Sequence, residues 1–105
     1  MIIRGGENIY PFEIESVLAE HPAVQQAAVV GVPDEHWGEA VRAFVTPRTG
    51  RSVTAEDLIA HCSGRLARYK VPREFVVLEA MPTNASGKIL KRELRTWDLP
   101  AVAGV

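Results

Sequence analysis

The feature that most restricts the fold is a pair of apolar runs separated by a short polar segment. The first run covers residues 23–33 and the second covers residues 40–46, and both are rich in valine and alanine. Such runs predict β-strands, and Pro33 and Pro47 predict where the strands end. Because the polar segment 34–39 is short, the two strands are expected to pair in antiparallel orientation.

Amphipathic segments around these strands predict three helices. The first follows Pro11, a residue suited to the first helical turn, and ends near His21, which precedes a proline. The second begins at Thr54, which forms an approximate capping box with Asp57, and the third follows Lys88. The apolar positions expected to face the core are Ile14, Val17 and Leu18 in the first helix, Leu58, Ile59, Cys62 and Leu66 in the second, and Leu90, Leu94 and Trp97 in the third.

The order of elements is therefore helix, strand, strand, helix, strand, helix, with the last strand over residues 74–79. A chain of 105 residues, 47% hydrophobic and 24% charged, has the size and composition of one small domain. We expect an α+β domain with a small antiparallel sheet of about three strands and helices packed on it. Residues 1–98 are assigned to this domain and residues 99–105 to a frayed tail.

The composition argues against several classes of protein. A net charge of −1 gives no reason to expect a nucleic-acid binder or a membrane-surface binder, and no apolar run approaches the length of a membrane span. The single cysteine, Cys62, excludes an intramolecular disulfide and fits a reducing compartment, so a cytoplasmic location is predicted. We interpret Cys62 as a core residue. His21, His36 and His61 lack metal-ligand spacing, so no metal site is predicted.

A loop of turn-forming residues near the C-terminus ends in a lysine. Pro82, Asn84, Ser86 and Gly87 favour non-helical backbone, and Lys88 follows directly. The helical pattern begins only after them, which predicts that Lys88 lies in the first turn of the last helix. A cation there opposes the helix dipole, and a residue that breaks a local rule is a candidate for function. The alternative is a lysine that simply extends into water.

The pattern Pro-x-x-x-x-Gly-Lys-x-x-x-Arg, from Pro82 to Arg92, resembles the C-terminal signature of the adenylate-forming superfamily. That superfamily includes acyl- and aryl-CoA synthetases, luciferases and the adenylation domains of peptide synthetases. The resemblance implies that Lys88 is the catalytic lysine of the first half-reaction, in which a carboxylic acid and ATP form an acyl-adenylate.

A second motif near the N-terminus resembles the loop that follows the interdomain hinge in the same superfamily. It comprises Gly5-Gly6-Glu7-Asn8-Ile9 and the run Pro11-x-Glu13-Ile14-Glu15. The resemblance implies that Gly5 and Gly6 line the channel for the pantetheine arm of coenzyme A. A thin arm needs backbone without side chains beside it, which glycine supplies. From the residues alone, a simple hairpin or turn remains the alternative.

Further positions match residues that contact coenzyme A in this superfamily. Trp37 corresponds to an aromatic position near the CoA nucleotide, and an exposed aromatic can stack on adenine. Tyr69, Lys70 and Arg73 correspond to aromatic and basic contacts with the CoA adenine and phosphates. Without the resemblance, Trp37 is equally well read as a core or edge anchor, and the cations as a solvated helix end.

The resemblance covers residues 2 to 95 and implies the C-terminal mobile domain of an ATP-dependent acid–CoA ligase. Its partners are the ligase's large N-terminal domain, which binds most of ATP and Mg²⁺, and a carboxylic acid that this domain does not reveal. The isolated domain is expected to fold without turning over. One alternative is a peptide-synthetase adenylation subdomain, which the end of the sequence soon after Arg95 disfavours. The other is a free-standing interaction module without chemistry.

Overall fold

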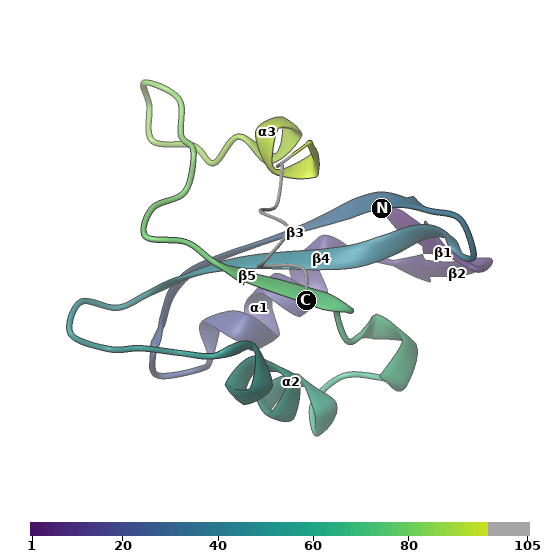
Figure 1. Ribbon diagram of the computed structural model, residues 1–105, viewed down its shortest axis with the longest axis horizontal. Coiled ribbons are helices and arrows are strands. Elements are labelled where there is room, and N and C mark those ends of the chain that lie inside the picture. Colours follow the sequence, from purple (N-terminus) through teal and green to yellow (C-terminus); the bar gives the residue numbers. More distant parts are fainter. Residues whose placement is uncertain (97–105) are drawn as a thin grey trace.

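The computed structural model describes residues 1–96 and contains one five-stranded sheet with helices on both faces (Figure 1). The predicted domain end at residue 98, the predicted tail 99–105 and the predicted core position Trp97 lie outside the described residues. The elements in chain order are β1 (Ile2–Arg4), β2 (Glu7–Ile9), α1 (Pro11–Ala19), β3 (Val24–Asp34), β4 (Gly38–Pro47), α2 (Ala55–Ser63), the 3-10 helix η1 (Arg68–Lys70), β5 (Glu74–Val77) and α3 (Lys91–Arg95).

The centre of the sheet is the antiparallel pair β3–β4, which confirms the pairing predicted for the two apolar runs. Strand β4 is longer than predicted, because it begins at Gly38 and includes Pro47. Strand β3 has the predicted length but lies one residue further along the chain and ends at Asp34. The strand order is β2-β1-β4-β3, so β3 ends the sheet on one side. An end strand tolerates a proline, whose missing N–H leaves no ladder bond unmade on the free edge.

The sheet contains five strands, which corrects the expected number of about three. The two additional strands, β1 and β2, form a hairpin around Gly5 and Gly6, and each is only three residues long. Such short strands give no alternating pattern in the sequence. The glycine pair thus forms a hairpin, which was the alternative left open by the sequence, and its strands extend the sheet beyond β4.

One strand pair is parallel, whereas the prediction was antiparallel throughout. The last strand, β5, pairs with β4 from Arg42 opposite Glu74 to Val45 opposite Val77. The chain between β4 and β5 contains α2 and η1, and a connection of that length allows the chain to return in the same direction. Helices α1 and α2 cover one face of the sheet, and α3 lies over the other (Figure 1).

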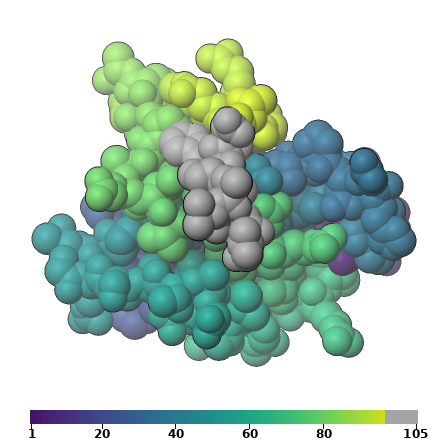
Figure 2. Space-filling view, viewed as in Figure 1, coloured from purple at the N-terminus to yellow at the C-terminus, as the bar shows by residue number. Residues whose placement is uncertain are grey.

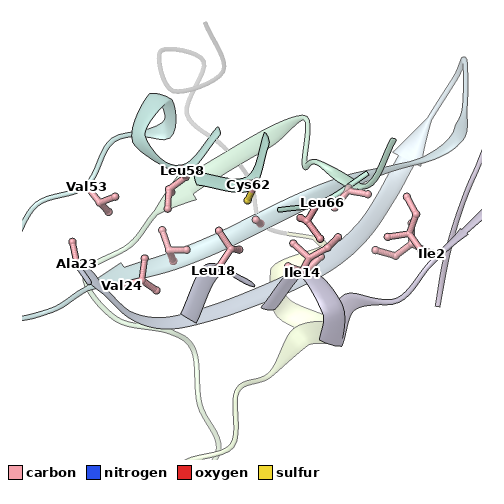
Figure 3. Packing of buried hydrophobic residues seen from close by; sticks show 14 residues of the cluster. Ile2, Ile14, Leu18, Ala23, Val24, Val53, Leu58, Cys62 and Leu66 are labelled. Carbon is pink, nitrogen blue, oxygen red and sulfur yellow. The ribbon is translucent and has the colours of Figure 1, made fainter. Parts of the chain in front are cut away.

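Two apolar clusters hold these layers together, one on each face of the sheet. Alternate residues of β3 point to opposite faces, so Val29 joins one cluster and Val30 the other. The larger cluster lies under α1 and α2 (Figure 3) and comprises Ile2, Ile9, Ile14, Leu18, Ala23, Val24, Val29, Val41, Ala43, Val45, Val53, Leu58, Cys62 and Leu66. The smaller cluster comprises Ala28, Val30, Val32, Ala40, Phe44, Met81 and Leu94.

Helices α1 and α2 begin as the sequence predicts. Pro11 occupies the first turn of α1. At α2, the Thr54 hydroxyl accepts a hydrogen bond from the Asp57 N–H at 3.1 Å, and the Asp57 carboxylate accepts one from the Thr54 N–H at 3.0 Å. Each bond satisfies an amide that the helix itself cannot, which is the purpose of a capping box.

The predicted inner face of α2 is correct except at Ile59. Leu58 and Cys62 are fully buried, and Leu66 is buried just after the helix ends. Ile59 is 42% exposed, because a residue directly after Leu58 in a helix points about 100° away from it. The burial of Cys62 in the larger cluster confirms its role as a core residue, and the same burial raises the pKa of its thiol to about 11.

No helix within residues 1–96 is long and apolar enough to cross a membrane.

Candidate functional site

Lys88 lies in a closed loop and not in a helix, which corrects the predicted position. Helix α3 starts at Lys91, three residues later, with Leu90 as its N-cap residue. The conflict with a helix dipole that the sequence pattern implied is therefore absent. The loop forms because Thr83 and Ile89 make an antiparallel bridge, and the Leu90 N–H donates to the Pro82 carbonyl at 2.9 Å.

The side chain of Asn84 organises the interior of this loop. Its Oδ1 accepts hydrogen bonds from the Ser86 N–H at 3.0 Å, the Ser86 hydroxyl at 2.9 Å and the Lys88 N–H at 2.9 Å. The Asn84 N–H in turn donates to the Lys88 carbonyl at 3.0 Å. Gly87 has a φ of +84°, a left-handed conformation that favours glycine. Both backbone polar groups of Lys88, its N–H and its carbonyl, are therefore hydrogen bonded to Asn84.

The side chain of Lys88 is exposed, and no ion pair found among residues 1–96 involves its ammonium. Figure 2 shows the loop of residues 82–90, in yellow-green, projecting from the surface at the upper left. An exposed ammonium on such a loop is free to bind an anion from outside residues 1–96.

The second candidate site is the glycine turn of the β1–β2 hairpin, and its two glycines have different surroundings. The Gly5 N–H donates to the Trp37 carbonyl at 2.8 Å, and a Cβ on Gly5 would lie 2.7 Å from Cε3 of the Trp37 ring. A Cβ on Gly6 would meet no atom within 4 Å. The absence of a side chain is therefore required by Trp37 at Gly5, whereas Gly6 presents bare backbone to its surroundings.

Trp37 is a half-buried anchor between the hairpin and the β3–β4 turn. The Arg4 guanidinium lies 4.2 Å above its ring, and the His36 ring meets it edge-on at 4.6 Å. Arg4 and Gly5 both contact the indole. Within its own domain, Trp37 therefore anchors the hairpin at the edge of the structure, as the sequence analysis allowed. Its predicted contact with coenzyme A remains a prediction.

Asp34 brings Trp37 and Arg73 together. Its Oδ1 accepts hydrogen bonds from the N–H groups of Trp37 and His36, each at 2.9 Å, and its Oδ2 lies 3.5 Å from the Arg73 guanidinium. The hydrogen bond from the Trp37 N–H, followed by that from His36, lowers the pKa of Asp34. Gly5, Trp37 and Arg73 therefore form a single connected group at the hairpin end of the domain.

The remaining predicted contacts, Tyr69 and Lys70, lie in η1 and interact with their own domain. Tyr69 is half-buried and packs against the larger core cluster. The Lys70 ammonium forms an ion pair with Glu13 of α1 at 2.9 Å, and this hydrogen bond raises the pKa of Lys70. Within residues 1–96, neither side chain forms an ion pair or a ring contact with Gly5, Trp37 or Arg73. A pocket of about 330 Å³ lies beside η1 and is lined by Ser63, Leu66, Arg68 and Val71.

The histidines take part in local contacts. The His21 and His61 rings meet edge-on at 5.1 Å, and His61 Nε2 lies 2.7 Å from the Val17 carbonyl. In the described part of the chain, no group of three or more His, Cys, Asp or Glu side chains is arranged to hold a metal ion.

The sequence analysis did not identify the residues whose side chains hold the two sites together. These are Asn84 in the lysine loop and Asp34 in the β3–β4 turn. Both precede a turn and accept hydrogen bonds from amides two or more residues ahead, which is the usual behaviour of Asx residues. That signal was present in the sequence. The contact of Asp34 with Arg73 was not, because it joins residues 39 positions apart.

The fold and these two sites define a small α+β domain that presents a lysine loop and a glycine hairpin at separate ends (Figure 1). The chain belongs to the family described as AMP-binding enzyme C-terminal domain, which it matches over residues 13–88.

Two proteins that are similar to this chain in sequence are CoA ligases. The chain is 55% identical over 95 residues to a 2-succinylbenzoate–CoA ligase of Bacillus mycoides, and 50% identical over 95 residues to a mitochondrial medium-chain acyl-CoA ligase of Mus musculus. Each match covers 90% of this chain but only 19% and 15% of the respective relative. The chain thus spans about a fifth or less of the length of these relatives.

Solved structures of similar enzymes share the fold. A fatty acyl-CoA synthetase from Mycobacterium tuberculosis is 49% identical with a TM-score of 0.84 over 91% of this chain and 19% of its own. An o-succinylbenzoate CoA synthetase from Bacillus subtilis, in complex with an acyl-adenylate intermediate, is 46% identical with a TM-score of 0.83 over 94% of this chain and 20% of its own. MatB from Rhodopseudomonas palustris, with ATP bound, is 36% identical with a TM-score of 0.85 over 90% of this chain and 19% of its own.

Proposed function

We propose that this chain is the C-terminal mobile domain of an ATP-dependent acid–CoA ligase, in which Lys88 serves acyl-adenylate formation and the Gly5–Gly6 turn serves thioester formation. The observation that carries the proposal is the environment of Lys88. Its backbone is held by Asn84, its ammonium is exposed, and none of the ion pairs in residues 1–96 involves it.

In the first step, a carboxylate oxygen of the acid attacks the α-phosphorus of ATP, and pyrophosphate leaves. Negative charge builds on the oxygens around the phosphorus, so a fixed cation lowers the barrier by electrostatic stabilisation. A lysine suits this role because its charge is compact and its side chain is long. The closed loop fixes the starting point of that side chain, which reduces the freedom lost on engagement.

In the second step, the thiol of coenzyme A attacks the acyl carbon and AMP leaves. The lysine loop rises at the upper left of Figure 1, whereas the hairpin β1–β2 lies at the right. Two groups at separate ends of a rigid domain cannot both face one active centre, so the domain has to turn between the two steps. Gly6 has no atom near its missing Cβ, so it leaves room for a pantetheine arm beside the backbone of the hairpin.

Trp37 and Arg73 are the proposed contacts with the CoA nucleotide that lie closest to this hairpin. Asp34 connects them, and the Arg73 side chain is exposed beyond its ion pair. Tyr69 and Lys70 remain proposed contacts from η1, although the Lys70 charge is shared with Glu13. ATP and coenzyme A are the proposed co-substrates. ATP is bound to MatB, and the product analogue OSB-NCoA is bound to a double mutant of the Bacillus subtilis o-succinylbenzoate CoA synthetase.

The large N-terminal domain of the same enzyme and a carboxylic acid are the proposed partners. We keep the cytoplasm as the proposed compartment on the basis of the single thiol, Cys62. The mouse relative is mitochondrial by name. Pyrophosphate release by the full-length enzyme, measured across a panel of acids, would identify the acid and would separate a ligase from a non-catalytic module.

The test of the proposal is Lys88→Ala in the full-length enzyme, with the two half-reactions assayed separately. Adenylate formation should fall by ~10² to 10³, as for the loss of other preorganised charge-stabilising donors. Thioester formation from supplied acyl-adenylate should change little. Arg95→Ala, which removes an exposed cation from α3, is the matched control and should leave both rates intact. Equal loss of both half-reactions, or no loss, would refute the role of Lys88.

A further inference from the structure

The carboxylate of Glu15 joins the end strand of the sheet, β3, to helices on both of its faces, α1 and α3. Glu15 belongs to α1, yet its Oε2 accepts a hydrogen bond from the Val29 N–H of β3 at 2.9 Å. The same oxygen lies 2.6 Å from the ammonium of Lys91, the first residue of α3. Since α1 and α3 cover opposite faces (Figure 1), this contact runs around the edge of the sheet.

The position of Glu15 at the sheet edge has a clear physical reason. Strand β3 ends the sheet, so amides on its outer side have no neighbouring strand to bond. Glu15 supplies an acceptor to Val29, and its remaining negative charge attracts Lys91. The Glu15 side chain is 20% exposed and the Lys91 side chain 38%, so the pair is partly shielded from water.

Helix α3 depends on such external anchors because it is only five residues long. Leu94 anchors its inner side in the smaller core cluster, and the Lys91 ion pair anchors its first turn. The closed loop that carries Lys88 leads directly into this turn, and the Leu90 N–H ties the end of the loop to Pro82. A change in the orientation of α3 is therefore passed to the loop as a whole.

We propose that Glu15 is a positioning residue for Lys88, acting through its ion pair with Lys91. The proposal rests on the proposed function of Lys88 and adds to it a connection between the two sequence motifs of the domain. Glu15 holds the first turn of α3 against the edge of β3. It thereby fixes the position of the lysine loop relative to the sheet. Glu15 itself touches no substrate.

The experiment uses the full-length enzyme with Lys91→Met, Lys91→Arg and Glu15→Gln. Lys91→Met removes the charge, Lys91→Arg retains it, and Glu15→Gln keeps an acceptor for Val29 while removing the charge of the pair. We expect Lys91→Met and Glu15→Gln each to lower kcat for adenylate formation about five- to tenfold, with thioester formation from supplied acyl-adenylate unchanged. Lys91→Arg should restore adenylation, and the double variant should be no worse than either single one, because one interaction is lost in all three.

Arg65→Met is the matched control, because it removes a surface ion pair with Glu20 that does not involve α3. It should leave both half-reactions unchanged. Amide hydrogen exchange at Ile89 and Leu90 supplies a second readout and should accelerate in Lys91→Met but not in Arg65→Met. Equal losses in both half-reactions, or additive losses in the double variant, would overturn the positioning role.

The two proposals fail in distinguishable ways. If Lys88→Ala leaves adenylation intact, the proposed function fails, and the positioning role fails with it. If Lys88→Ala abolishes adenylation while Lys91→Met and Glu15→Gln keep wild-type rates, only the positioning role is overturned.

Discussion

Asn84 and Lys88 hydrogen bond to each other in both directions across the closed loop. The Asn84 side-chain oxygen accepts from the Lys88 N–H at 2.9 Å, and the Lys88 carbonyl accepts from the Asn84 N–H at 3.0 Å. A long lysine side chain has many rotamers, and its reach is useful only if its origin is fixed. The loop provides that fixed origin while leaving the ammonium itself exposed.

Replacing Asn84 should therefore loosen the base of Lys88 without removing its charge. Asn84→Ala removes the acceptor for three donors, and we expect adenylate formation by the full-length enzyme to fall about five- to tenfold, the equivalent of about 1 to 1.4 kcal/mol of barrier. Asn84→Asp keeps an acceptor and should retain most activity. Thr83→Ala, in the same loop, is the control. Similar losses for Thr83→Ala and Asn84→Ala would argue against a specific role for Asn84.

The two glycines of the hairpin should respond differently to alanine. Gly5→Ala introduces a Cβ 2.7 Å from the Trp37 ring at a residue with φ of +57°, so both a clash and backbone strain result. Gly6→Ala adds only the strain of φ +87°, at roughly 1–2 kcal/mol. Urea denaturation should show a clearly larger loss of stability for Gly5→Ala.

A double variant separates the clash from the strain. In a Trp37→Leu background the indole is absent, so Gly5→Ala should cost about as much as Gly6→Ala does. An unchanged difference between the two alanines in that background would contradict the role assigned to Trp37. In the full-length enzyme, a bulkier residue at Gly6 should slow thioester formation selectively, because the proposed mechanism uses the hairpin only in that step.

The stability of the β3–β4 turn should depend on pH through Asp34. Hydrogen bonds from Trp37 and His36 lower the pKa of Asp34 below its ordinary value of 3.8, so its contribution to stability is present above that pH. The contribution is lost as the pH falls through the lowered pKa of the folded state. Asp34→Asn should be less stable than the wild type at pH 6, and the difference should shrink below pH 3.8. Urea midpoints across this range provide the measurement, and a constant difference would refute the assignment.

Cys62 should be unreactive in the folded chain. Burial raises the pKa of its thiol to about 11 from an ordinary 9.0, so little thiolate forms at pH 8. Alkylation by iodoacetamide, followed by mass spectrometry, should be slow in buffer and fast in denaturing urea. Because the folded pKa is the higher one, stability from Cys62 is present below pH 9.0 and declines as the pH rises towards 11. Rapid alkylation of the native chain would show that the thiol is accessible.

Local features of the fold were predictable from the sequence because their causes are local. The capping box of Thr54 and Asp57, the position of Pro11 and the β3–β4 pair depend on residues close together in the chain. The short polar segment before β4 is too short for a crossover connection, so the two strands pair in antiparallel orientation. The family, and the candidate role of Lys88, came from short motifs in a characteristic order, and the family was confirmed by comparison.

Non-local features were predicted poorly or missed. The parallel partner of β4 and the attachment of the β1–β2 hairpin to β4 depend on pairing between distant segments, which no periodicity of three or four residues reveals. Lys88 was assigned to the first turn of a helix because the loop was expected to end at Gly87. The bridge between Thr83 and Ile89 extends the loop beyond Lys88. Ile59 fitted the helical pattern but falls at the margin of the buried face.

The amino-acid order alone specifies which chemical groups the domain carries, namely a lysine after a glycine and a pair of glycines before a helix. Which of these groups is free to meet another molecule depended on the tertiary structure. Trp37 occupies the space beside Gly5 but not Gly6, Glu13 shares the charge of Lys70, and no such partner among residues 1–96 takes up Lys88. The reason is that availability depends on neighbours in space, and those neighbours come from elements that folding brings together from distant parts of the chain.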